Sequence, residues 1–137
     1  MTRIYSFLFL FFLLSAPKAY SFTKVSPKAY SYSLADVDYS KADSTKVVKL
    51  LREASRLKSS TNWMTYFGKQ FCGVPYVAKT LERNKTERLI VNLRQLDCTT
   101  FVETTLALTL CAKNGKTSFA DYCHYLRLVR YCQGRVS

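Results

Sequence analysis

One cysteine of this 137-residue chain stands where a nucleophile could work. Cys98 follows Asp97 at the start of a stretch with helical apolar spacing, so we expect it in the first turn of a helix. Unpaired N–H groups and the helix dipole stabilise a thiolate there, and they can also receive the charge of a carbonyl oxygen under attack. Asp97 can cap the helix, but its charge opposes thiolate formation. The spacing therefore predicts a candidate nucleophile for acyl transfer, against the alternative of a small buried hydrophobic side chain.

Acyl transfer by a thiol also needs a base, usually a histidine held by a third polar group. The sequence has one histidine, His124, which falls among aromatic and apolar residues in the middle of the last helix that we expect. A packing or surface role suits it better than catalysis, although the sequence leaves open whether it lies near Cys98.

Several cysteines and this histidine are of metal-ligand type, but their spacing does not match a zinc site. Structural zinc sites use close pairs of ligands, and an adjacent cysteine and histidine on a helix point about 100 degrees apart. We predict no metal and no cofactor from the candidates Cys111, Cys123, His124 and Cys132.

Four helices and one strand are expected to position the cysteine. Ser44 is a plausible N-cap for a helix over residues 45–58, and Asn62 for a shorter one whose apolar face ends before Gly73. Residues 73–78 must be extended because of Pro75, and the β-branched residues 89–93 form a strand. The helix after Asp97 should end at Gly115, and the last one should run from Ser118 to Gly134. The nucleophile helix is expected to bury Phe101, Val102, Thr105, Leu108 and Ala112.

The first residues are typical of a secretory signal. Arg3 gives a positive start to an apolar stretch that is too short to span a membrane, and small residues surround the expected cleavage site after Ser21. We predict a signal peptide over 1–21, with a retained anchor as the alternative, an irregular leader over 22–42, and one domain over 43–137.

The chain is strongly basic, with a net charge of +12, and remains so without residues 1–21. This charge favours anionic partners, and export makes cell-wall polymer or lipid headgroups more plausible than nucleic acid. Five cysteines are an odd number for an exported chain, so at least one should stay free or pair between molecules.

Several short blocks carry a family resemblance. Gly-Val-Pro-Tyr at 73–76 and Asp-Cys-Thr-Thr-Phe-Val-Glu at 97–103 resemble the NlpC-type branch of papain-like cell-wall peptidases. With the blocks at 68–71, 80–82 and 91–94, the stretch from about 61 to 134 looks most like the branch described as N-acetylmuramoyl-L-alanine amidase-like. One departure is Ala-Lys-Thr at 78–80, where the wider pattern often has paired glycines.

The resemblance implies an α+β, papain-like fold whose helices pack on an antiparallel sheet. It implies that Cys98 attacks the amide between N-acetylmuramic acid and L-alanine of the stem peptide, and that Tyr76, Asp97 and Thr99 contact the substrate. In the family the catalytic histidine comes from a sheet downstream of the nucleophile helix. This chain is then expected to supply mainly the helical half with one or two short strands, to be truncated, and to be inactive.

Two non-catalytic hypotheses remain beside the amidase: an exported module that binds the cell wall, and an interaction protein. In each case the expected location is the periplasm or the outside of a bacterium, with peptidoglycan muropeptides as partners. We expect no nucleic acid partner and no stable membrane insertion after signal cleavage, and the oligomeric state stays open.

Overall fold

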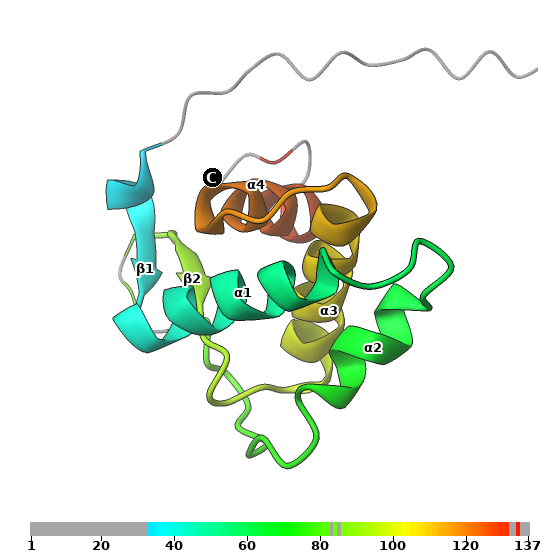
Figure 1. Cartoon of the computed structure of the whole chain (residues 1–137). Helices are drawn as coiled ribbons and strands as arrows, with labels where there is room; N and C mark the ends of the chain where they lie inside the picture. The colour runs from blue at the N-terminus through cyan, green and yellow to red at the C-terminus, as the bar shows by residue number, and fades with distance from the viewer. Residues whose placement is uncertain (1–32, 83, 85, 132–133, 135–137) are drawn as a thin grey trace, which may run out of the picture. The chain divides into compact units, whose positions relative to one another are not determined.

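The computed structural model describes residues 33–82, 84, 86–131 and 134 (Figure 1). The signal peptide predicted for residues 1–21 lies outside them, as does Cys132. The elements follow one another as a 3-10 helix Leu34–Asp36, β1 Val37–Tyr39, α1 Lys41–Ala54, α2 Trp63–Lys69, β2 Leu89–Val91, α3 Cys98–Lys113 and α4 Phe119–Arg130.

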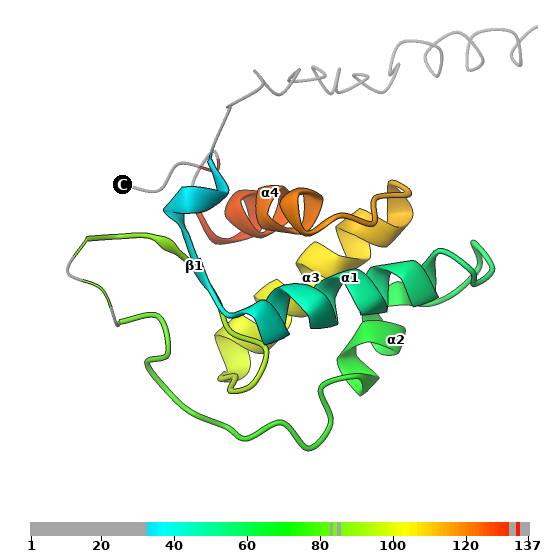
Figure 2. The same ribbon diagram turned by 60° about the vertical axis from the view of Figure 1, so that its left-hand side comes forward.

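Helix α3 is the centre of the domain. Helices α1, α2 and α4 all pack against it, and Figures 1 and 2 show them arranged around it. The buried side chains form one apolar cluster, in which Phe67, Leu89, Leu93, Leu108 and Tyr122 are fully enclosed. The helix that carries Cys98 is therefore held on three sides by neighbouring helices.

Strands β1 and β2 form a small sheet beside the helices. They pair in parallel, with Val37 opposite Leu89 and Tyr39 opposite Val91. The mixed helix and strand content agrees with the α+β class, whereas the resemblance had implied an antiparallel sheet. The strand predicted over 89–93 is present at 89–91, but β1 lies in the segment expected to be an irregular leader.

Helix α1 starts earlier than the sequence pattern predicted, and it ends at Ala54 rather than at residue 58. Its N-cap is Ser40, whose side chain accepts from the Asp43 N–H while Asp43 accepts from the Ser40 N–H. This reciprocal capping box satisfies donors that would otherwise be unpaired, so the helix begins at Lys41 and Ser44 lies inside it.

The other helix starts are confirmed, with Asn62, Asp97 and Ser118 as N-caps. The expected buried face of α3 is wrong in part. Phe101 and Val102 are 36% and 52% exposed, because α3 turns a face rich in threonine to its neighbours instead. The buried residues of α3 are Thr100, Thr104, Thr105, Ala107, Leu108, Thr109 and Cys111.

Within the described residues, no helix has the length and apolar character needed to cross a membrane.

Candidate active site

Cys98 is the first residue of α3, and its side chain is exposed. Asp97 caps the helix: its carboxylate accepts from the backbone N–H and the hydroxyl of Thr100, each at 2.8 Å. The Thr100 hydroxyl in turn lies 2.9 Å from the Asp97 N–H, which completes a capping box. The helix start that presents the thiol is therefore fixed by local hydrogen bonds.

The Asp97 carboxylate is engaged in capping the N-terminus of α3. Hydrogen bonds from Thr100, aided by Thr99 and by the nearby Arg130 guanidinium, hold its pKa below the ordinary 3.8 against the opposing effect of burial. Asp97 is therefore ionised at neutral pH, and its acceptors are directed at the N–H groups of Thr99 and Thr100. Among the described residues, no hydrogen bond occupies the backbone N–H of Cys98. That N–H remains available to an oxyanion formed beside the sulfur.

The segment that carries Tyr76 lies directly beside the residues that lead into α3. Tyr76 pairs with Leu96 in an isolated parallel bridge, with the Leu96 N–H donating to the Pro75 carbonyl at 3.2 Å and the Val77 N–H to the Leu96 carbonyl at 3.1 Å. The Tyr76 side chain is 70% exposed. The fold thus brings an accessible aromatic ring to the region of Cys98, two residues beyond Leu96.

The remaining predicted substrate contact, Thr99, is exposed on the same first turn of α3 as the thiol. The structure therefore gathers Tyr76, Asp97, Cys98 and Thr99 at one end of α3. Asp97 is the member whose side chain is already engaged in capping.

His124 does not join them. Helices α3 and α4 run antiparallel, because Arg130 contacts Glu103 near one end while Asp121 acts electrostatically on Cys111 near the other. His124 therefore lies roughly level with residue 109, about 16 Å along the α3 axis from Cys98. Its imidazole, which packs edge-on to Tyr125, is far beyond hydrogen-bond distance of the thiol.

Comparison with known proteins gives the family. The sequence matches the model of the AmiA-like family, described as N-acetylmuramoyl-L-alanine amidase-like, over residues 66–137, slightly more than half of the chain. The chain belongs to the AmiA-like family. No curated protein and no solved structure matches it.

The region matched by the AmiA-like model is tied to α1 by Asp43, which sequence analysis did not single out. Asp43 is buried, and its Oδ1 accepts from the Leu93 N–H at 3.0 Å and from Arg94 Nε at 3.4 Å. Burial by itself would raise the pKa of this carboxyl, but the hydrogen bonds from Ser40 and Leu93 and the charge of Arg94 lower it on balance. Asp43 thus anchors the segment that enters α3.

A second link fixes the other side of the nucleophile helix. Arg130, at the end of α4, donates to Glu103 at 2.8 Å and to the Ile90 carbonyl at 2.7 Å. Both side chains of the ion pair are largely enclosed. Arg130 thereby joins α3, α4 and β2, and its charge acts on Asp97 next to the thiol.

The two buried thiols differ in character from Cys98. Burial raises the pKa of Cys111 and of Cys123 to about 12, so neither is a nucleophile at neutral pH. Cys72 is exposed, and all four described cysteines are free. Within the described part of the chain, no three cysteine, histidine or carboxylate side chains gather closely enough to hold a metal ion.

Proposed function

We propose that this chain is a cysteine amidase of bacterial peptidoglycan that acts on the amide between N-acetylmuramic acid and L-alanine of the stem peptide. The observation that carries the proposal is the exposed Cys98 thiol in the first turn of α3, next to its own unpaired N–H. The AmiA-like family supplies the class of substrate, and the helix start supplies the chemical group that would attack it.

The reaction would be acyl transfer in two steps. The Cys98 sulfur attacks the carbonyl carbon of the lactyl group, and the Cys98 N–H donates to the oxyanion that forms. The intermediate collapses to a thioester as the C–N bond breaks, and the amino group of L-alanine leaves with the proton that the Cys98 thiol has given up. Water then hydrolyses the thioester, which releases the lactyl carboxylic acid and restores the thiol.

The neighbouring residues would orient the substrate. Tyr76 offers an exposed ring for packing against the sugar or peptide, and Thr99 offers a hydroxyl on the same turn as the sulfur. Asp97 would act mainly by holding the helix start, because its carboxylate is engaged with Thr100. We propose this positioning role for Asp97 in addition to the substrate contact that the resemblance implies.

The base is the missing component. His124, the single histidine of the sequence, lies about 16 Å along the α3 axis from the thiol. We therefore expect this chain by itself to turn over muropeptides very slowly, and we propose that a papain-like arrangement is completed by a histidine that this sequence does not contain. The site of action would be the periplasm or the cell exterior.

Chemical rescue tests this proposal. The chain is incubated with muropeptides, with and without added imidazole as an external base, and free stem peptide is measured by mass spectrometry. Release should be near background without imidazole and should rise with imidazole concentration. Cys98→Ala should abolish the rise, whereas Cys72→Ala, which removes the other exposed described thiol, should retain it.

Two outcomes of this experiment would contradict the proposal. Rescue that persists in Cys98→Ala would exclude Cys98 as the nucleophile. Efficient release of stem peptide without imidazole, lost when His124 is replaced, would show that His124 is the base. Helix α4 would then have to pack against α3 in a different position from the one described.

The basic charge of the chain favours a second candidate, an exported module that binds cell-wall polymer without cleaving it. Binding of muropeptides that is unchanged in Cys98→Ala, together with no release at any imidazole concentration, would support this alternative.

A further inference from the structure

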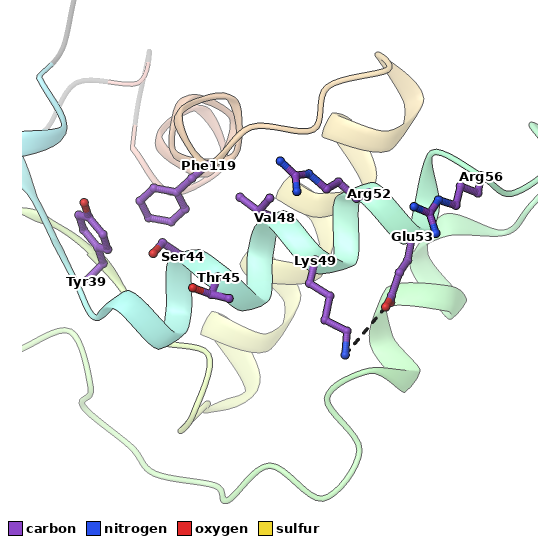
Figure 3. A pocket seen from close by; sticks show the side chains of 9 residues that line it. All are labelled: Tyr39, Ser44, Thr45, Val48, Lys49, Arg52, Glu53, Arg56 and Phe119. Carbon is purple, nitrogen blue, oxygen red and sulfur yellow. Dashed lines mark ion pairs between the residues drawn. The ribbon is translucent and has the colours of Figure 1, made fainter.

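A groove lies along the outer face of α1, between β1 and the start of α4, and it has a volume of about 650 Å³ (Figure 3). Cys98 does not line this groove, so a ligand bound there would not depend on the amidase site. The lining residues are Tyr39, Ser44, Thr45, Val48, Lys49, Arg52, Glu53, Arg56 and Phe119.

The charges of this α1 groove are unbalanced. Lys49 and Glu53 form an ion pair at 3.9 Å, drawn in Figure 3, and so largely offset each other. Arg52 and Arg56 are both exposed, and no carboxylate among the described residues forms an ion pair with either. Two guanidinium groups are therefore available, and their planar forks suit bidentate binding of carboxylates.

The opposite end of the α1 groove is aromatic. The rings of Tyr39 and Phe119 lie 4.7 Å apart between centroids, and Tyr39 remains 39% exposed. Val48 contributes an aliphatic side chain between this end and the arginines. A ligand that fills the groove should thus be apolar at one end and anionic at the other.

The dimensions favour an extended peptide. From Ser44 to the end of α1 at Ala54 the groove follows about 15 Å of helix, the length of about five residues in extended conformation. Arg52 lies in the last turn of α1 and Arg56 two residues beyond the helix end at Ala54, so both arginines belong to the same end of the groove. Alternate residues of an extended peptide point the same way, so two acidic residues spaced i, i+2 would present both carboxylates to this arginine end.

We propose that the α1 groove binds an acidic peptide segment in extended conformation, with two alternate carboxylates on Arg52 and Arg56 and an apolar side chain against Tyr39. A purely anionic polymer would leave the aromatic end unused.

Fluorescence anisotropy with a labelled synthetic peptide, Phe-Ser-Ser-Glu-Ser-Glu, tests the proposal at low salt. Binding to the full chain should weaken about tenfold in the double variant Arg52→Gln/Arg56→Gln. The matched control Lys69→Gln/Lys113→Gln removes the same charge from exposed positions outside the α1 groove and should change Kd less than twofold. Tyr39→Ala should weaken binding about threefold, and a peptide with Gln in place of Glu should not bind measurably.

Three results would overturn the inference. Equal losses in the two double variants would show attraction by net charge alone, and equal binding of the Gln peptide would show that carboxylates are not recognised. Tighter binding of a single-stranded DNA dodecamer, lost in Arg52→Gln/Arg56→Gln, would identify a phosphate-backbone site instead.

Discussion

Replacing Asp43 with alanine should destabilise the domain more than replacing any exposed charged residue. The Leu93 N–H that donates to Asp43 is fully buried, so water cannot replace the lost acceptor, at a cost of about 1–3 kcal/mol. Loss of the capping box with Ser40 adds about 0.5–1 kcal/mol. The Arg94 side chain is 59% exposed, so its ion pair contributes little. The free energy of unfolding should fall by about 1.5–4 kcal/mol in total.

Urea unfolding followed by Trp63 fluorescence measures this loss, since the indole is buried in the same core. Asp43→Asn keeps an acceptor oxygen for Leu93 and should cost less than Asp43→Ala. Asp36→Ala, at an exposed position, should change stability by less than about 0.5 kcal/mol. If Asp43→Ala costs no more than Asp36→Ala, the link between α1 and the segment that enters α3 does not exist in solution.

The Asp43 carboxyl also determines how the stability of the domain changes with pH. The pKa of Asp43 is lower in the folded state than its ordinary value of 3.8. Its contribution to the free energy of unfolding is therefore complete above about pH 4 and is lost as the pH falls through the pKa of the folded state. The stability difference between the wild type and Asp43→Asn should therefore narrow in acid. A difference that widens below about pH 4 would contradict the assigned hydrogen bonds.

Two further predictions concern the thiols and the ion pair of α4. Iodoacetamide at neutral pH should label the exposed thiols of the native chain and should label the buried thiols only after unfolding. Peptide mapping identifies the labelled residues. Labelling of a buried thiol in the native chain would contradict the α3–α4 packing. Among the described residues, the exposed thiols are Cys72 and Cys98, and the buried ones are Cys111 and Cys123. Arg130→Ala leaves Glu103 largely enclosed without its partner, and it should lower the free energy of unfolding by about 2–4 kcal/mol in the urea assay. A loss below about 1 kcal/mol would show that the pair is open to water.

Features encoded by neighbouring residues were predictable. The N-caps Asn62, Asp97 and Ser118 each bond to a backbone N–H three residues later, so the sequence around them determines where the helix starts. The place of Cys98 in the first turn of α3 was predictable for the same reason, because it follows from the Asp97 cap.

Features that depend on distant partners were missed. Strand β1 has a register set by β2 some fifty residues away, and nothing in residues 37–39 alone reveals this partner. Asp43 has the same property, since its acceptor role depends on Leu93. Phe101 remains 36% exposed although its ring packs edge-on against Phe71, a contact between distant segments that periodicity cannot show. The position of Arg130 near Asp97 likewise depends on how α4 crosses α3.

Acylation of the chain by an activated donor tests the central claim most directly, because it asks which sulfur attacks without requiring a base for the leaving group. The donor is the p-nitrophenyl ester of N-acetylmuramic acid, and the product is identified by intact mass and peptide mapping. One acyl group should appear on Cys98, with equimolar nitrophenol released; the adduct should persist in Cys72→Ala and vanish in Cys98→Ala. Acylation of Cys72 at an equal rate, or none at Cys98, would contradict the assignment of Cys98 as the nucleophile.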